Sequence, residues 1–192
     1  MNKNRVEAFS DGVLAIIVTI MVLEMKVPHE GADLSTLLPI MPVFLSYILS
    51  FSMVLIYWNN HHHLFQSVKQ INGKVLLANG FLLFWLSLMP FASAWMGENH
   101  FAKIPVALFG VILMMSGVAY SILSKTLLKI KANETTLAKA IGNSTKEKIS
   151  TFAYISAIPI SLFFPIISCL IYLAVAIMWL IPDKRIEKAL FD

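Results

Sequence analysis

Residues 12–23 read Gly-Val-Leu-Ala-Ile-Ile-Val-Thr-Ile-Met-Val-Leu, an uncharged run that directly follows Arg5-Val6-Glu7-Ala8-Phe9-Ser10-Asp11. Extended to Val27, this run approaches the roughly 20 mostly apolar residues that a helix needs to cross a bilayer. Similar runs recur along the chain, separated by short polar stretches. The pattern predicts an all-α integral membrane protein that forms a single transmembrane domain over residues 1–192.

The composition supports this prediction and excludes a sizeable soluble domain. Hydrophobic residues make up 58% of the 192 residues, charged residues only 14%, and the mean hydropathy is +0.75. Soluble domains carry about a quarter charged residues. The net charge of +4 comes from lysines spread over several polar segments, without a basic stripe carrying stacking aromatics. We therefore expect the lipid bilayer as partner and no nucleic acid.

The apolar runs predict spans at about residues 11–27, 42–65, 75–95, 104–123, 149–164 and 166–182. The segment from Pro28 to Pro39 is expected to be a loop. The connection at about 125–148 is rich in lysine, and its periodic Leu127, Leu128, Ile130 and Leu137 indicate that the fourth helix either continues into water or lies along the membrane interface. Residues 149–182 are too long for one upright helix, and proline interrupts the helical hydrogen-bond ladder. We therefore expect a tight hairpin near Phe164 and Pro165.

The positions of the basic residues select a topology, because Lys and Arg near helix ends favour the cytoplasm. With six spans and an inside N-terminus, only Lys26 and Lys103 remain outside. Five spans would force the basic C-terminus outside. We therefore predict a multi-pass protein with cytoplasmic N- and C-termini. The inside segments then hold Lys3, Arg5, Lys69, Lys74, Lys125, Lys129, Lys131, Lys139, Lys146, Lys148, Lys184, Arg185 and Lys188.

Ser10 and Asp11 stand where the polar N-terminus meets the first apolar run. One interpretation is that either residue caps the start of the helix by accepting from its free backbone N–H groups. The other is a paired role at the membrane edge, since an unpaired polar group in hydrocarbon costs several kcal/mol. The residues alone favour the cap.

The run Arg5, Phe9, Ser10 and Asp11 resembles the signature that opens the first helix in the transmembrane protein 175 family of potassium-permeable channels. The stretch Trp58-Asn59-Asn60-His61-His62-His63-Leu64-Phe65 is similar to the end of that family's second helix. Asn79, Trp85 and Pro90 stand where its third helix carries similar residues. The resemblance is specific over roughly the first hundred residues. Beyond them it depends on the span count and the basic connection.

The resemblance implies a prokaryotic homotetramer, located in the cell membrane, whose four first helices line a central pore. In this family rings of bulky apolar side chains close the pathway in place of a Thr-Val-Gly-Tyr-Gly filter loop, and this sequence contains no such loop. The constriction follows the motif's Asp by five residues, which is Ile16 here. Potassium, and other monovalent cations with it, would be the permeating ions, and no cofactor is expected.

The spacing within the first helix agrees with that placement. Ile16, Ile20 and Leu23 share one helix face at i, i+4 and i+7, with Thr19 beside them. At about 1.5 Å rise per residue they extend over roughly 10 Å. Apolar rings can gate by dewetting, and a hydroxyl ring can replace part of an ion's hydration shell. The alternative is that this face packs against other helices of the same chain.

The resemblance also implies a network that fixes the rotation of the pore helix. It would join the pore helix to the second and third helices. A His at the membrane edge also suggests pH sensing as a weaker hypothesis. At the outward end, Glu24 and Lys26 are interpreted either as a pair at the water interface or as charges at the pore mouth. The network residues are Arg5, Phe9, Ser10, Asp11, His61, Asn79 and Trp85.

The residues supply no catalytic constellation, and we predict that the protein is not an enzyme. Consecutive helical residues point about 100° apart, so His61, His62 and His63 cannot converge on one metal ion. Cys169 has no His close in sequence and is interpreted as an apolar filler. A secondary transporter for a small solute or ion remains the alternative to a channel, because Pro159 and Pro165 allow a broken helix.

Overall fold

The computed structural model describes residues 3–29, 31–66, 68, 70–130 and 145–180. The secondary-structure elements of these residues are all helices, which confirms the all-α fold class. They are α1 Asn4–Leu23, η1 Leu34–Ile40, α2 Met41–Gln66, α3 Gly73–Ser87, α4 Met89–Glu98, α5 Lys103–Ile130, α7 Thr145–Ser161 and α8 Pro165–Leu180.

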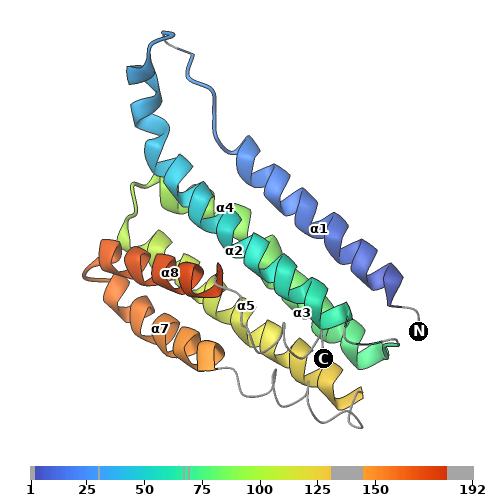
Figure 1. Ribbon diagram of the computed structural model, residues 1–192. Helices are drawn as coiled ribbons and strands as arrows, with labels where there is room; N and C mark the ends of the chain where they lie inside the picture. Colours follow the sequence, from blue (N-terminus) through green and yellow to red (C-terminus); the bar gives the residue numbers. More distant parts are fainter. Residues whose placement is uncertain (1–2, 30, 67, 69, 131–144, 181–192) are drawn as a thin grey trace.

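The helices form an elongated bundle with α1 along one side and the α7–α8 hairpin on the other (Figure 1). The α1 helix packs against α2, α3 and α4, whereas α5 packs against α3 and α7. The fully buried Leu82, Met96 and Leu113 come from α3, α4 and α5. These three helices therefore form the centre of the subunit, and α1 is a peripheral helix with one covered face.

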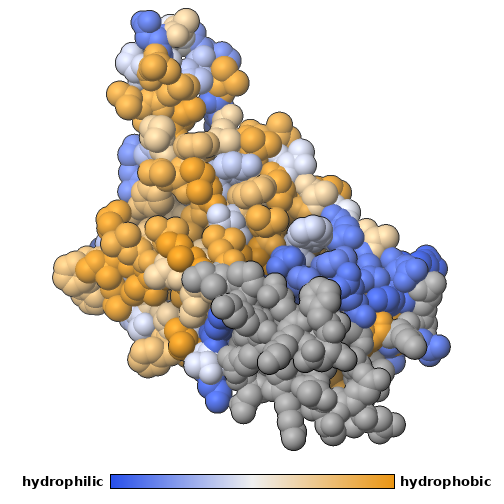
Figure 2. Space-filling model, in the orientation of Figure 1, coloured by the Kyte–Doolittle hydropathy of each residue, from blue (hydrophilic) through white to orange (hydrophobic). Residues whose placement is uncertain are grey.

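Within the described residues, four helical segments are long and apolar enough to cross a membrane: Asn4–Leu23, Leu34–Gln66, Gly73–Glu98 and Lys103–Lys129. The fifth apolar helix, Pro165–Leu180, is shorter. Figure 2 shows a broad apolar surface over the middle of the molecule, with hydrophilic residues gathered toward its ends. Lipid tails are as apolar as these side chains and can cover them, so this surface suits a bilayer.

The first helix begins at Asn4, well before the predicted start at residue 11. Ser10 and Asp11 lie inside the helix, so their interpretation as N-cap residues is wrong. Lys3 occupies the N-cap, and the hydroxyl of Ser10 donates to the carbonyl of Val6 at 2.8 Å. The physical reason is that polar residues tolerate helical geometry in water. A helix therefore need not end where the membrane does.

Two further segments differ from their predictions. The loop expected before the second span contains the 3-10 helix η1. The span expected at 75–95 is divided into α3 and α4 at Leu88, with Pro90 in the first turn of α4. Proline lacks the N–H that would continue the α3 ladder, and its ring clashes with the carbonyl four residues earlier.

The last two helices form a tight hairpin at residues 162–164. The backbone N–H groups of Phe163 and Phe164 both donate to the carbonyl of Ile160, at 3.0 and 2.8 Å. Ser168 of α8 donates to the carbonyl of Ala157 in α7 at 2.7 Å. This turn lies where the hairpin is predicted. The predicted end of the sixth span at residues 181–182, and the connection at 131–144, lie outside the described residues.

Candidate functional site

The two faces of α1 differ sharply in how much of them the chain covers. Val6, Ser10, Leu14, Ile17 and Met21 form the buried face, which packs on the bundle. On the other face Ile16 is 60% exposed, Ile20 42% and Leu23 73%, and Thr19 is exposed as well. The alternative that these side chains pack within their own chain is therefore wrong. The subunit leaves a stripe of bulky apolar side chains uncovered along this helix.

Thr19 lies within the uncovered stripe and carries its only hydroxyl. Its Oγ1 donates to the carbonyl of Ala15 at 2.7 Å. This bond occupies the proton and leaves the oxygen's acceptor capacity facing outward. Gly12 lies on the exposed side one turn before Ile16, and a Cβ there would meet no atom within 4 Å. Along this exposed side of α1, the open position at Gly12 is followed by the bulky Ile16. The hydroxyl of Thr19 comes next, before the bulky Ile20 and Leu23.

Ser10, Asn79 and His61 form a buried hydrogen-bonded chain that links α1, α3 and α2. Asn79 donates from Nδ2 to the Ser10 hydroxyl at 3.0 Å, and its Oδ1 lies 2.8 Å from Nε2 of His61. All three side chains are at least 97% buried. In this amide orientation Nε2 of His61 carries the proton, because Oδ1 can only accept. The chain of bonds fixes the buried face of α1 against two helices.

Asp11 has a partner outside this buried chain. The indole Nε1 of Trp58, in α2, donates to Oδ1 of Asp11 at 3.0 Å. Both side chains are exposed, and they border an apolar cleft of about 330 Å³ between α1 and α2. Trp58 was not among the predicted network residues, although it opens the motif that contains His61. Its spacing from His61, nearly one helical turn, was the available signal.

Three predicted network residues do not join either set of bonds within the subunit. Arg5 is exposed and has no hydrogen bond or ion pair with a described residue. Phe9 is 64% exposed. The indole of Trp85 contacts the rings of Phe81 and Phe84, and its buried Nε1 has no partner in the described part of the chain. The basic residue that links α1 to α2 is instead Lys3.

Lys3 ties the start of α1 to the end of α2. Its ammonium donates to the carbonyl of Phe65 at 2.8 Å and lies 3.8 Å from the carboxylate of Glu7. Helix carbonyls at a C-terminus have no intrahelical partner, so a cation there is favourable. Lys3 lies only two residues before Arg5, but it stands outside the signature of Arg5, Phe9, Ser10 and Asp11.

The charges at the other end of α1 pair differently from the expected Glu24–Lys26 contact. Lys26 instead lies 3.7 Å from the carboxylate of Glu98 at the end of α4. Both side chains are largely exposed, and such surface pairs contribute about 1 kcal/mol or less. The pair interpretation of Glu24 and Lys26 is therefore wrong.

The three consecutive histidines have different surroundings, and Nδ1 of His63 is buried without a hydrogen-bond partner among the described residues. His61 contacts Asn79, and its ring stacks on Phe65 with centroids 4.4 Å apart. His62 lies 2.8 Å from the amide of Gln66. Among the described residues no three His, Cys, Asp or Glu side chains could hold one metal ion.

Comparison with known proteins gives this geometry a context. The family model described as "Endosomal/lysosomal potassium channel TMEM175" matches residues 5–90. A potassium channel of Chryseobacterium sp. (strain P1-3) is 56% identical over 190 residues, which cover 99% of this chain and 98% of the relative. The human endosomal/lysosomal proton channel TMEM175 is 33% identical over 116 residues, covering 55% of this chain and 23% of that protein.

The fold has a solved counterpart. The crystal structure of a lysosomal potassium-selective channel TMEM175 homologue from Chamaesiphon minutus superposes with a TM-score of 0.80 at 28% sequence identity. The match covers 92% of this chain and 95% of that one, so it extends well past the residues that the family model matches.

Proposed function

Because this chain belongs to the TMEM175 family of potassium channels, we propose that it forms a potassium-favouring cation pathway at the centre of a homotetramer. In this proposal four α1 helices surround the axis. Ile16, Ile20 and Leu23 form apolar rings that close the pathway, and Thr19 forms a polar layer between them. The protein lies in the prokaryotic cell membrane with its N- and C-termini in the cytoplasm.

The observation that carries the proposal is the uncovered stripe on α1. A helix that packs against three others on one face, and has an equally apolar opposite face, needs a second apolar surface or lipid to cover it. Four copies of the stripe around an axis would cover one another in part. A narrow channel lined by isoleucine and leucine loses water, and the cost of dehydrating an ion then closes it.

The buried hydrogen-bonded chain supports the same proposal by fixing the rotation of α1. Successive residues on a helix differ by about 100° in direction, so a shift of one residue would turn Ile16 away from the axis. Ser10 bonded to Asn79 opposes that rotation. We infer that this bond and the Asp11–Trp58 bond position the pore helix without contacting ions.

The channel proposal accounts for the comparisons better than a carrier does. The family and the relatives named above are called channels, and none is called an enzyme or a carrier. This agrees with the prediction that the protein is not an enzyme, and it does not favour the transporter alternative. Permeating K⁺ is what membership of a potassium channel family implies.

Single-channel recording in planar bilayers tests the proposal. Ile16→Asn would place four amides at the constriction, and we expect a higher open probability and weaker discrimination of K⁺ from Na⁺. Thr19→Ala should alter selectivity more than open probability. Ile155→Asn is a matched control, because Ile155 on α7 is 56% exposed but distant from α1. Unchanged currents and selectivity in both α1 variants would remove the pore assignment.

A further inference from the structure

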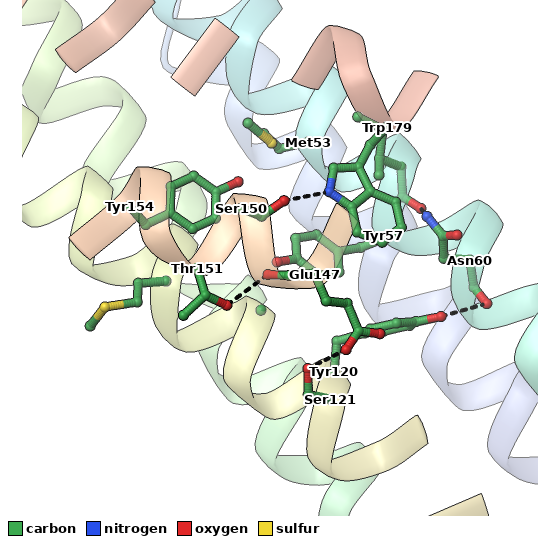
Figure 3. A pocket seen from close by; sticks show the side chains of 13 residues that line it. Met53, Tyr57, Asn60, Tyr120, Ser121, Glu147, Ser150, Thr151, Tyr154 and Trp179 are labelled. Carbon is green, nitrogen blue, oxygen red and sulfur yellow. Dashed lines mark hydrogen bonds between the residues drawn. The ribbon is translucent and has the colours of Figure 1, made fainter. Parts of the chain in front are cut away.

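A second pocket lies within the subunit between α2, α5, α7 and α8, on the side of the bundle away from α1 (Figure 3). Its volume is about 50 Å³. It is lined by Asn60 near the end of α2, Tyr120 in the second half of α5, Glu147 near the start of α7 and Trp179 near the end of α8. These positions lie at one end of the bundle, the end proposed to be cytoplasmic.

Two hydroxyl groups in this pocket have no partner in the described part of the chain. Among the described residues, none forms a hydrogen bond with the hydroxyl of Tyr57 or Tyr154. The side chain of Tyr154 is 5% exposed, and Figure 3 shows its hydroxyl directed toward Ser150 and Trp179. Neither oxygen is among the described side-chain atoms that are buried without a partner, so both are open to the pocket. A hydroxyl oxygen in that position can bond with a polar group that enters from outside the chain.

The neighbouring polar groups are already bonded and give the pocket a fixed shape. The Trp179 indole donates to the Ser150 hydroxyl at 2.8 Å, and the Tyr120 hydroxyl donates to the carbonyl of Asn60 at 3.4 Å. Figure 3 shows both bonds at the rim. The rings of Tyr57 and Tyr120 pack edge to face, with centroids 6.1 Å apart. The walls are therefore aromatic and rigid.

Glu147 supplies a half-buried carboxylate to this aromatic enclosure. It accepts a hydrogen bond from Ser121 at 3.2 Å, and a carboxylate has capacity for several further donors. Glu147 precedes the predicted start of the fifth span, and burial raises the pKa of its carboxyl despite the Ser121 bond and the charge of Lys125. A cation beside the carboxylate would stabilise its ionised form and so offset the cost of burying that charge.

We propose that this pocket binds a primary alkylammonium group. Its N–H donors would meet the Glu147 carboxylate and the hydroxyl oxygens of Tyr57 and Tyr154. Its charge would lie against aromatic rings, which attract cations through their electron-rich faces. One water needs about 10 to 15 Å³ of such space, so the pocket suits a group of about three or four heavy atoms.

The ammonium group has two possible sources. One is a free small amine from the cytoplasm. The other is the ethanolamine head group of a phospholipid, because Trp and Tyr gather at the level of the head groups. A contact between an ammonium group and an aromatic ring already exists at the rim, where the ammonium of Lys146 lies 5.8 Å from the centre of the Trp179 ring.

Thermal unfolding of the purified full-length protein in phospholipid-free detergent tests the shared chemistry. Ethylammonium chloride, titrated at constant ionic strength against KCl and tetramethylammonium chloride, should raise the midpoint with saturation. Tetramethylammonium has no N–H donor and should not. In Glu147→Gln the apparent affinity for ethylammonium should fall by at least about tenfold. Tyr154→Phe, which removes only the hydroxyl, should weaken it several-fold.

Matched controls are Glu98→Gln and Tyr47→Phe, a carboxylate and a tyrosine outside the pocket. Both should bind ethylammonium like the parent protein. Native mass spectrometry after transfer to nanodiscs, with phosphatidylethanolamine or phosphatidylcholine as the zwitterionic lipid, identifies the lipid source. If the parent retains phosphatidylethanolamine and Glu147→Gln does not, the lipid head group is the source of the ammonium.

A shift by ethylammonium alone would assign a free amine. The proposal is overturned if neither probe binds, or if the parent and Glu147→Gln bind equally. Because these measurements record binding and not current, they stand or fall separately from the channel proposal.

Discussion

The amide of Asn79 in α3 donates to the hydroxyl of Ser10 in α1 at 3.0 Å, across 69 residues of sequence. The Ser10 hydroxyl in turn donates a hydrogen bond to the carbonyl of Val6, and Oδ1 of Asn79 accepts one from His61. One amide therefore completes the polar contacts of two other helices. Removing it leaves the buried Nε2 of His61 without a partner and also takes away the donor to Ser10, which is more costly than losing a single exposed bond.

We therefore predict that Asn79→Ala destabilises the protein by about 1 to 2 kcal/mol, the upper part of the range for hydrogen bonds between membrane helices. Ser10→Ala should have a smaller effect, because Ser10 bonds a carbonyl of its own helix. Unfolding midpoints in detergent measure both, and the double variant should be clearly non-additive. Asn99→Ala is the control, since that exposed amide bonds only Trp95 in its own helix. Equal effects of Asn79→Ala and Asn99→Ala would contradict the network.

The bond from Trp58 to Asp11 predicts a separate set of variants. Asp11→Asn keeps the acceptor oxygen and should resemble the parent in tetramer stability and open probability. Asp11→Ala and Trp58→Phe each remove the bond, so they should impair both properties to a similar extent. Combining them should add little, because the second change has no bond left to break. Size-exclusion chromatography and single-channel recording measure the two properties. A fully additive double variant would show that the two residues act independently.

The sequence predicts where the helices lie along the chain better than it predicts which face of each helix is buried in the bundle. The apolar runs indicate where the chain crosses the membrane, but on α1 both the buried Leu14 and the exposed Ile16 are large and apolar. In a membrane protein hydropathy cannot distinguish a face covered by helices from one covered by lipid or by another subunit. Only the motif around Ser10 and Asp11 indicated which face of the first helix turns inward.

Other features depend on contacts between distant residues, which no local pattern encodes. The break at Leu88 is ambiguous in sequence, because Pro90 is tolerated equally in a first helical turn and at a kink. The pocket near Glu147 brings together Tyr57, Tyr120 and Trp179, which belong to three different helices. The contact between Trp58 and Asp11 is an exception, because both residues belong to motifs that are visible in the sequence. This contact could therefore be predicted from the sequence.

Gly97 lies where the backbones of α2 and α4 come closest to an added side chain, and this contact predicts the effect of a larger residue. A Cβ on Gly97 would lie 2.6 Å from the backbone Cα of Val43 and 2.6 Å from the Ser46 hydroxyl, so α2 and α4 would have to separate. Gly97→Ala should therefore destabilise the protein by about 1 to 3 kcal/mol. Gly80→Ala on α3 is the matched control, because nothing lies within 4 Å of its Cβ position. That variant should be neutral or stabilised by up to about 1 kcal/mol through helix propensity. A similar loss of unfolding midpoint in both variants would mean that the α2–α4 contact is not close.

The raised pKa of the Glu147 carboxyl predicts a pH-dependent effect of Glu147→Gln on stability. For an acid whose pKa is higher in the folded state, folding opposes ionisation, so this group destabilises the protein progressively as pH rises above the unfolded pKa and fully above the folded pKa. Below the unfolded pKa the carboxyl is protonated in both states and contributes nothing. Without added amine, Glu147→Gln should therefore have the higher unfolding midpoint at neutral pH, and this advantage should vanish on acidification. The Glu98→Gln control loses its ion pair with Lys26, so it should be no more stable than the parent at neutral pH. A Glu147→Gln variant less stable than the parent at neutral pH would instead mean that the ionised carboxylate is fully compensated by its neighbours.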